Sequence, residues 1–74
     1  MEKSYYWQKG VERYYKVFVY KDLLGHWVLT KAWGGLQNRL GNYEHLTLFT
    51  KEAIRDCLAE IFERRDKRGY KLII

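Results

Sequence analysis

Residues 50–69 read TKEAIRDCLAEIFERRDKRG and carry the pattern of one amphipathic helix. Thr50 is a good N-cap, Glu52 suits the positive end of the helix dipole, and Gly69 provides a stop. The apolar residues recur at intervals of three and four, which places them on a single helical face. They are Ala53, Ile54, Cys57, Leu58, Ile61 and Phe62. The pattern predicts a helix over roughly residues 51–67, whose apolar stripe must pack against another layer.

The segments on either side of this helix predict that layer. Residues 14–20 (YYKVFVY) are dense in aromatic and β-branched side chains, which favour a strand. Both alternating sets contain apolar residues, so we expect this strand in the sheet interior. Residues 26–33 and 43–49 predict two further strands, and residues 70–74 a short returning strand. The expected fold is therefore α+β: a small antiparallel sheet with one long helix packed on one face.

Glycine-containing segments set the expected boundaries. Asp22 to Gly25 predicts a turn, and Gly34-Gly35 is expected to break the second strand and open a loop of roughly seven residues. Residues 1–10 show no clean period, which predicts a flexible N-terminal arm. Residues 11–74 are then expected to form a single domain.

Size and cysteine content narrow the class of protein. A chain of 74 residues is near the lower size limit for one domain, and its 47% hydrophobic content argues against disorder. Cys57 is the only cysteine, so no internal disulfide can form, and a reducing cytoplasm is favoured. No apolar run approaches the ~20 residues that span a bilayer, and the N-terminus is too polar for a signal peptide. We expect a cytoplasmic protein with no membrane partner.

The inventory of reactive groups argues against an enzyme. The sequence has no Gly-rich phosphate loop. His26 and His45 lie in separate predicted strands, without another metal ligand at a suitable spacing. Cys57 falls on the apolar stripe, which favours a buried structural thiol over a nucleophile. We therefore expect no catalysis, no metal, no cofactor and no small-molecule substrate.

Positive charge is concentrated at the C-terminal end. The formal net charge is +5, and residues 64–74 carry five basic side chains against the single carboxylate of Asp66. Residues 51–63 carry four acidic and two basic side chains. A basic segment of this kind can attract a polyanion. It is equally compatible with a solvated helix end, where cations favour the dipole.

An ordered set of short motifs resembles a known family. Residues 32–36 read AWGGL, residues 39–42 RLGN, and residues 67–70 KRGY, with the predicted helix before the last of these. The chain resembles the WGR domain, which occurs in DNA-dependent ADP-ribose polymerases and in small bacterial proteins. The resemblance implies that Trp33 packs against nucleic acid. It also indicates that DNA is the ligand rather than RNA. The chain departs from the family at Gly35, which stands at the motif arginine, and at Gln37, which stands at a loop glycine.

The residues themselves point in part to the same chemistry. An indole beside Gly34 and Gly35 is open to a base or sugar, and stacking on it would contribute about 1–3 kcal/mol. Trp33 could instead be a lid on the small core, as we expect for Trp27. The candidate phosphate contacts are Lys31, Arg39, Arg64, Arg65, Lys67, Arg68 and Lys71.

Two functions remain open on the sequence. The first is a nucleic-acid-binding module that uses Trp33 and these cations. The alternative is a non-enzymatic adaptor that presents the same aromatic side chains to a protein partner. The two differ in whether Trp33 and the basic C-terminal segment share one surface.

Overall fold

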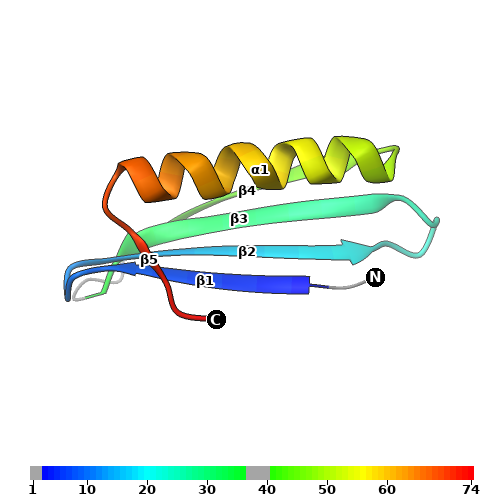
Figure 1. The fold of residues 1–74 in the computed structure, drawn as a ribbon. Helices are drawn as coiled ribbons and strands as arrows, with labels where there is room; N and C mark the ends of the chain where they lie inside the picture. Colours follow the sequence, from blue (N-terminus) through cyan, green and yellow to red (C-terminus); the bar gives the residue numbers. More distant parts are fainter. Residues whose placement is uncertain (1–2, 37–40) are drawn as a thin grey trace.

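The computed structural model describes residues 3–36 and 41–74, which form five strands and one helix. The strands pair antiparallel in the order β4-β3-β2-β1-β5, and the helix lies along one face of the sheet (Figure 1). The predicted α+β class and single-helix layer are confirmed. The elements are β1 (Lys3–Lys9), β2 (Arg13–Lys21), β3 (Trp27–Gly35), β4 (Gly41–Leu48), α1 (Lys51–Lys67) and β5 (Lys71–Leu72).

Helix α1 begins and ends where its sequence signals predict. The Thr50 hydroxyl oxygen accepts a hydrogen bond from the Ala53 backbone N–H at 3.0 Å, which satisfies one of the unpaired donors of the first turn. At the other end, Gly69 takes a φ of +83°, a backbone conformation that glycine adopts without steric cost. The Gly69 N–H donates to the Asp66 carbonyl and the Tyr70 N–H donates to the Arg65 carbonyl. This pair of bonds is the Schellman motif, and it turns the chain back toward the sheet.

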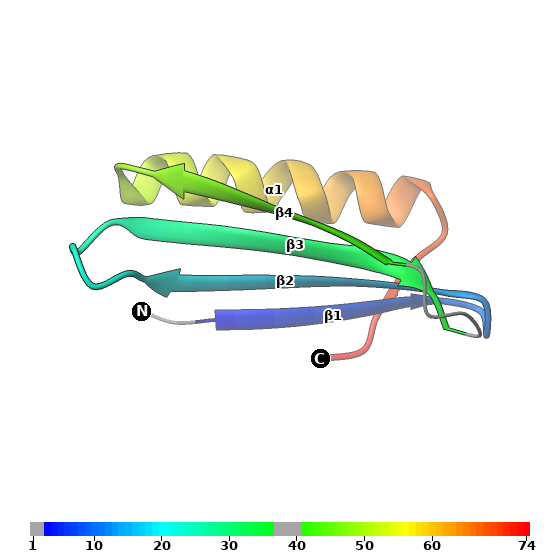
Figure 2. The ribbon, with the colours of Figure 1, turned by 180° about the vertical axis from the view of Figure 1, so that it is seen from behind.

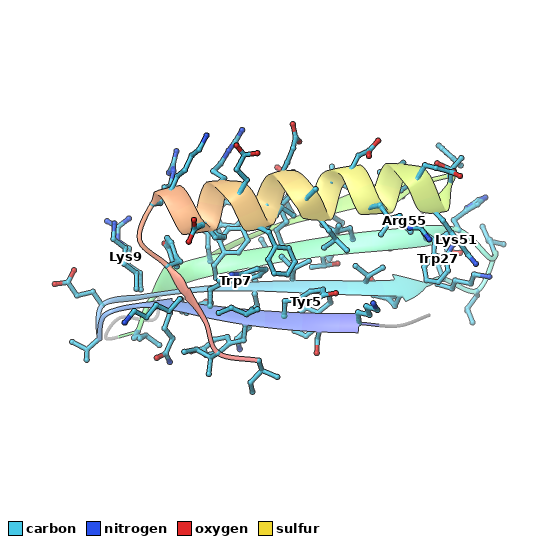
Figure 3. The ribbon with its side chains drawn as sticks, viewed as in Figure 1. Tyr5, Trp7, Lys9, Trp27, Lys51 and Arg55 are labelled. Carbon is cyan, nitrogen blue, oxygen red and sulfur yellow. The ribbon has the colours of Figure 1, made fainter. Side chains whose placement is uncertain are left out.

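The core lies between α1 and one face of the sheet. Side chains alternate between the two faces of a strand, and the register aligns the odd-numbered residues of β1, β2 and β3 on the helix side. Figure 3 shows Tyr5 and Trp7 between β1 and the helix. Trp27 is buried, as predicted. The buried cluster consists of Trp7, Tyr15, Val17, Val19, Trp27, Leu29, Ile54 and Ile61.

The prediction of a flexible arm over residues 1–10 is wrong for residues 3–9. These residues form β1, which pairs with β2 on one side and with β5 on the other. Trp7 is only 2% exposed and is among the most buried side chains of the core. The pattern was missed because Tyr6, on the opposite face, puts an aromatic residue in both alternating sets.

The expected strand break at Gly34-Gly35 is also wrong. Strand β3 continues to Gly35, because Gly34 pairs with Tyr14 of β2 and with Gly41 of β4. Neighbouring strands on both sides satisfy the backbone groups, and this outweighs the low strand propensity of glycine. The rest of the expected loop includes residues 37–40, which lie outside the described residues.

The predicted turn between β2 and β3 is confirmed, whereas β4 begins at Gly41 and ends at Leu48, and β5 covers only Lys71–Leu72. Asp22 organises the turn between β2 and β3, since one of its carboxylate oxygens accepts hydrogen bonds from the backbone N–H groups of Leu24 and His26. Strand β5 returns antiparallel to β1. None of the described residues forms a helix with the length and apolar character needed to cross a bilayer.

Candidate functional site

A groove of about 300 Å³ lies beside the C-terminal end of α1, on the side of the sheet that the helix covers. Five of its lining side chains are cationic and one is a carboxylate. We call it the basic groove. Its lining residues are Arg13, Tyr15, Lys31, Trp33, Glu44, Arg64, Arg65, Arg68 and Tyr70.

Strand register brings the floor of the basic groove together. Tyr15 of β2 pairs directly with Trp33 of β3, and Lys31 of β3 pairs with Glu44 of β4. Paired residues of antiparallel strands point to the same face. Arg13 is two residues before Tyr15 and therefore shares that face. The helix supplies the remaining wall from its last turn.

Trp33 contributes to the core and to the groove at once. Its ring centroid lies 6.0 Å from that of Tyr15 with an interplanar angle of 18°, so the two rings are nearly parallel. Trp33 also borders a second hollow of about 380 Å³, which Gly34 and Gly35 line with Arg13. One part of the indole therefore packs on Tyr15 while another remains accessible from the two hollows.

Arg65 is buried between two tyrosines. It is 8% exposed, and its Cζ lies 4.1 Å from the Tyr15 ring centroid and 4.9 Å from that of Tyr70. Its Nε is buried and has no hydrogen-bond partner among the described residues. Burial raises the pKa of Tyr15 above its ordinary value, with the nearby Arg65 charge acting in the opposite direction. Tyr15 therefore stays neutral at physiological pH and offers Arg65 a ring face.

The remaining predicted cations divide into several groups. Arg64 and Arg68 are exposed and line the basic groove. Lys31 also lines it, with its Nζ 3.7 Å from a carboxylate oxygen of Glu44. Lys67 instead pairs with Glu63 at 3.0 Å.

Two predicted contacts lie elsewhere. Lys71 pairs in register with Gln8, so its side chain shares the opposite face of the sheet. Arg39 lies outside the described residues. The structure thus gathers Lys31, Trp33, Arg64, Arg65 and Arg68 into one groove, with Gly34 and Gly35 in the hollow beside it.

Sequence reasoning missed four residues that line the basic groove: Arg13, Tyr15, Glu44 and Tyr70. The alternation from Arg13 to Tyr15 was visible, but only the β2–β3 register places both beside Trp33. Tyr70 reaches the groove because the Schellman motif directs it onto Arg65, the side-chain contact that commonly accompanies this motif.

Cys57 is partly buried against the core, and burial raises its pKa above the ordinary thiol value. It is therefore protonated and weakly reactive at neutral pH. No three histidine, cysteine, aspartate or glutamate side chains gather as cation ligands within residues 3–36 and 41–74.

No protein-family model matches this chain, and comparison with curated proteins and with solved structures found no match either. The resemblance to the WGR domain therefore remains a prediction.

Proposed function

We propose that this protein is a non-catalytic nucleic-acid-binding module and that the basic groove is its contact surface. The observation that carries the proposal is the position of Trp33 in one groove with five cationic side chains. Phosphates are held by arginine and lysine, and unpaired bases stack on aromatic rings. A surface on which cationic and aromatic side chains alternate suits nucleic acid better than a surface with only one of these two kinds.

The distribution of exposed cations suggests how a strand would lie. Arg64 lies in the last turn of α1, Arg68 is the C-cap residue four positions later, and Arg13 approaches from β2. In this arrangement the three guanidinium groups hold neighbouring phosphates, and Trp33 stacks on a terminal or unpaired nucleotide. The volume of about 300 Å³ falls at the lower end of the range typical of small-ligand sites, which is compatible with one nucleotide.

The preference for DNA over RNA rests on the resemblance to the WGR domain. Gly35 occupies the motif arginine position, so that arginine's role has no counterpart there. Arg13 pairs with Gly35 across the β2–β3 ladder. It places a guanidinium next to the motif, and we propose that it contacts the strand that stacks on Trp33.

The protein-interaction adaptor is the less favoured function. It would gain support if Trp33 and the basic C-terminal segment lay on opposite faces. Three cations of that segment, Arg64, Arg65 and Arg68, line the groove with Trp33, whereas Lys71 lies on the other face. A parent protein that binds no DNA or RNA at low salt would make the adaptor the better proposal.

The phosphate contacts can be tested by charge removal at two ends of one helix. Arg64→Ala with Arg68→Ala should reduce the slope of log affinity against log salt by about 2, for duplex and single strand alike, since phosphate contacts carry no sequence information. Lys51→Ala with Arg55→Ala is the matched control. These residues lie at the opposite end of α1 (Figure 3), and the control lowers the net charge equally. If both double variants reduced the salt slope equally, the phosphate contacts would not be confined to the basic groove, and the proposal would be refuted.

The stacking contact can be tested separately with Trp33→Ala. We expect affinity to fall by about 1–3 kcal/mol with little change in the salt slope, because stacking releases few counterions. Recessed ends should be affected more than long closed duplexes, whose inner bases cannot reach the ring. Circular dichroism must show a folded variant, since Trp33 also packs on Tyr15. If a folded Trp33→Ala protein binds every substrate as the parent does, then Trp33 is structural only.

A further inference from the structure

The face of the sheet opposite α1 carries a set of aromatic side chains. Figure 2 views the fold from behind and shows β4 passing in front of the helix. Strand alternation and register place the even-numbered residues of β1 to β3 and the odd-numbered residues of β4 on this open face. Phe18 and Tyr43 are 42% and 71% exposed. The aromatic residues of the face are Tyr6, Tyr14, Phe18, Tyr20 and Tyr43.

Two hollows lie on either side of Phe18. The first, of about 310 Å³, is lined by Tyr6, Lys16 and Phe18 together with Ser4, Tyr5 and Ile74. The second, of about 240 Å³, shares Ser4 and Phe18 and adds Lys3, Val19 and Tyr20. Each hollow is therefore lined by aromatic side chains, and Lys16 borders the first. Phe18 stands between them as a partition.

The first hollow has a fixed aromatic wall and an available charge. Gln8 Nε2 donates a hydrogen bond to the Tyr6 hydroxyl at 2.8 Å, which restrains the ring. The Lys16 Nζ lies 5.5 Å from the ring centroids of both Tyr6 and Tyr14. These cation–π contacts hold the ammonium group beside the rings, while Lys16 itself remains exposed.

The charge of the open face identifies the class of partner. Within the described strands, the positions on this face carry Lys16 and Lys71 and no aspartate or glutamate. A second copy docking here would use the same patch on both partners. That interface would bury lysines against lysines without a counter-charge, which is costly. A polyanion with flat apolar bases has the complementary chemistry.

We propose that the open face binds single-stranded nucleic acid, with two successive bases stacked on either side of Phe18. The Lys16 ammonium group neutralises a phosphate of these nucleotides. Aromatic side chains on an open sheet are a general platform for unpaired bases, which have free π-faces. A closed duplex presents none, so the site selects single strands. The proposal does not rest on the basic groove, because the two surfaces lie on opposite faces of the sheet.

The test is fluorescence anisotropy with a labelled ten-nucleotide oligothymidine and a blunt duplex of equal length. Phe18→Thr should weaken oligothymidine binding by about 5- to 150-fold, the equivalent of one lost stacking contact, and change duplex binding by less than about twofold. Phe49→Thr is the matched control, since Phe49 is 78% exposed and lies outside the open face. It should leave both affinities unchanged.

Further variants keep the result decisive. Lys16→Gln should weaken oligothymidine binding even if Phe18→Thr fails to fold, because its exposed ammonium group is not part of the core. Wild-type oligothymidine affinity in both folded variants would overturn the proposal. So would a parent that forms dimers which Phe18→Thr dissociates without affecting oligothymidine binding. Loss of binding in Phe18→Thr but not in Trp33→Ala would support the open face and reject the basic groove. Loss of binding in Trp33→Ala but not in Phe18→Thr would support the basic groove and reject the open face.

Discussion

At the scale of single residues, Arg65 shows why a cation in a basic segment is not always a free charge. The sequence places it beside Arg64, yet Arg64 is exposed and Arg65 lies against Tyr15 and Tyr70. Arginine suits this position because its planar guanidinium stacks on aromatic faces and is weakly hydrated. Arg65 thus connects the end of α1 to the sheet and fixes one wall of the basic groove.

Arg65→Ala should lower the free energy of unfolding by about 1–3 kcal/mol, through lost packing and lost cation–π contact. Urea denaturation followed by circular dichroism measures this effect. Arg64→Ala removes the same side-chain type one residue earlier and should change stability by less than about 0.5 kcal/mol. Equal stability of the two variants would show that the contacts of Arg65 contribute nothing.

At the scale of elements, the two ends of α1 serve different purposes. The Thr50 cap fixes where the helix begins. The Schellman motif at Gly69 ends the helix and also places Tyr70 in the basic groove. A local backbone conformation therefore positions a side chain of the candidate site.

Gly69→Ala should cost about 1–2 kcal/mol of stability, because alanine resists a positive φ. It should also weaken nucleic-acid binding to the basic groove by displacing Tyr70. Gly25→Ala is the matched control, since Gly25 has a φ of +84° in the β2–β3 turn. We expect a similar loss of stability there with unchanged binding. Melting curves and anisotropy on both variants separate the two effects, and equal binding losses would contradict this role of Gly69.

At the scale of the whole molecule, one core on one side of the sheet must hold the fold. A domain of 74 residues has a stability of only a few kcal/mol, so each large buried side chain is decisive. Trp7 is such a side chain. It contacts the rings of Tyr15 and Phe62 at centroid distances of 5.9 Å and 5.1 Å, which links β1, β2 and α1.

Trp7→Ala should unfold the domain, because losing a buried tryptophan costs about 3–5 kcal/mol. Tyr6→Ala changes the neighbouring residue on the open face and should leave a folded protein. Near-ultraviolet circular dichroism and thermal melting distinguish the two outcomes. If Trp7→Ala unfolded cooperatively near the melting temperature of the parent, residues 3–9 would contribute little to stability. That result would agree with a flexible N-terminal arm and contradict the role of β1 in the core.

The sequence predicted those features that depend on residues close together along the chain. The limits of α1 follow from Thr50, the apolar stripe and Gly69, all within 20 residues. Strand β1 was missed because its partners are remote in the sequence and Tyr6 obscures its alternation. The basic groove was only partly predicted for the same reason. Arg13 reaches Trp33 through strand register, which side-chain pattern alone does not specify.

The pairing of β1 with β5 has a consequence for synthesis of the chain. Trp7 pairs with Leu72, and backbone bonds join Tyr6 to Ile73 and Ile74. Ribosomes add about 5–20 residues per second, so the outer backbone groups of β1 wait roughly 3–13 seconds for their partners. During this interval an unpaired strand edge can pair with another nascent chain. Slower initiation, which spaces ribosomes along the message, should therefore raise the yield of monomeric protein.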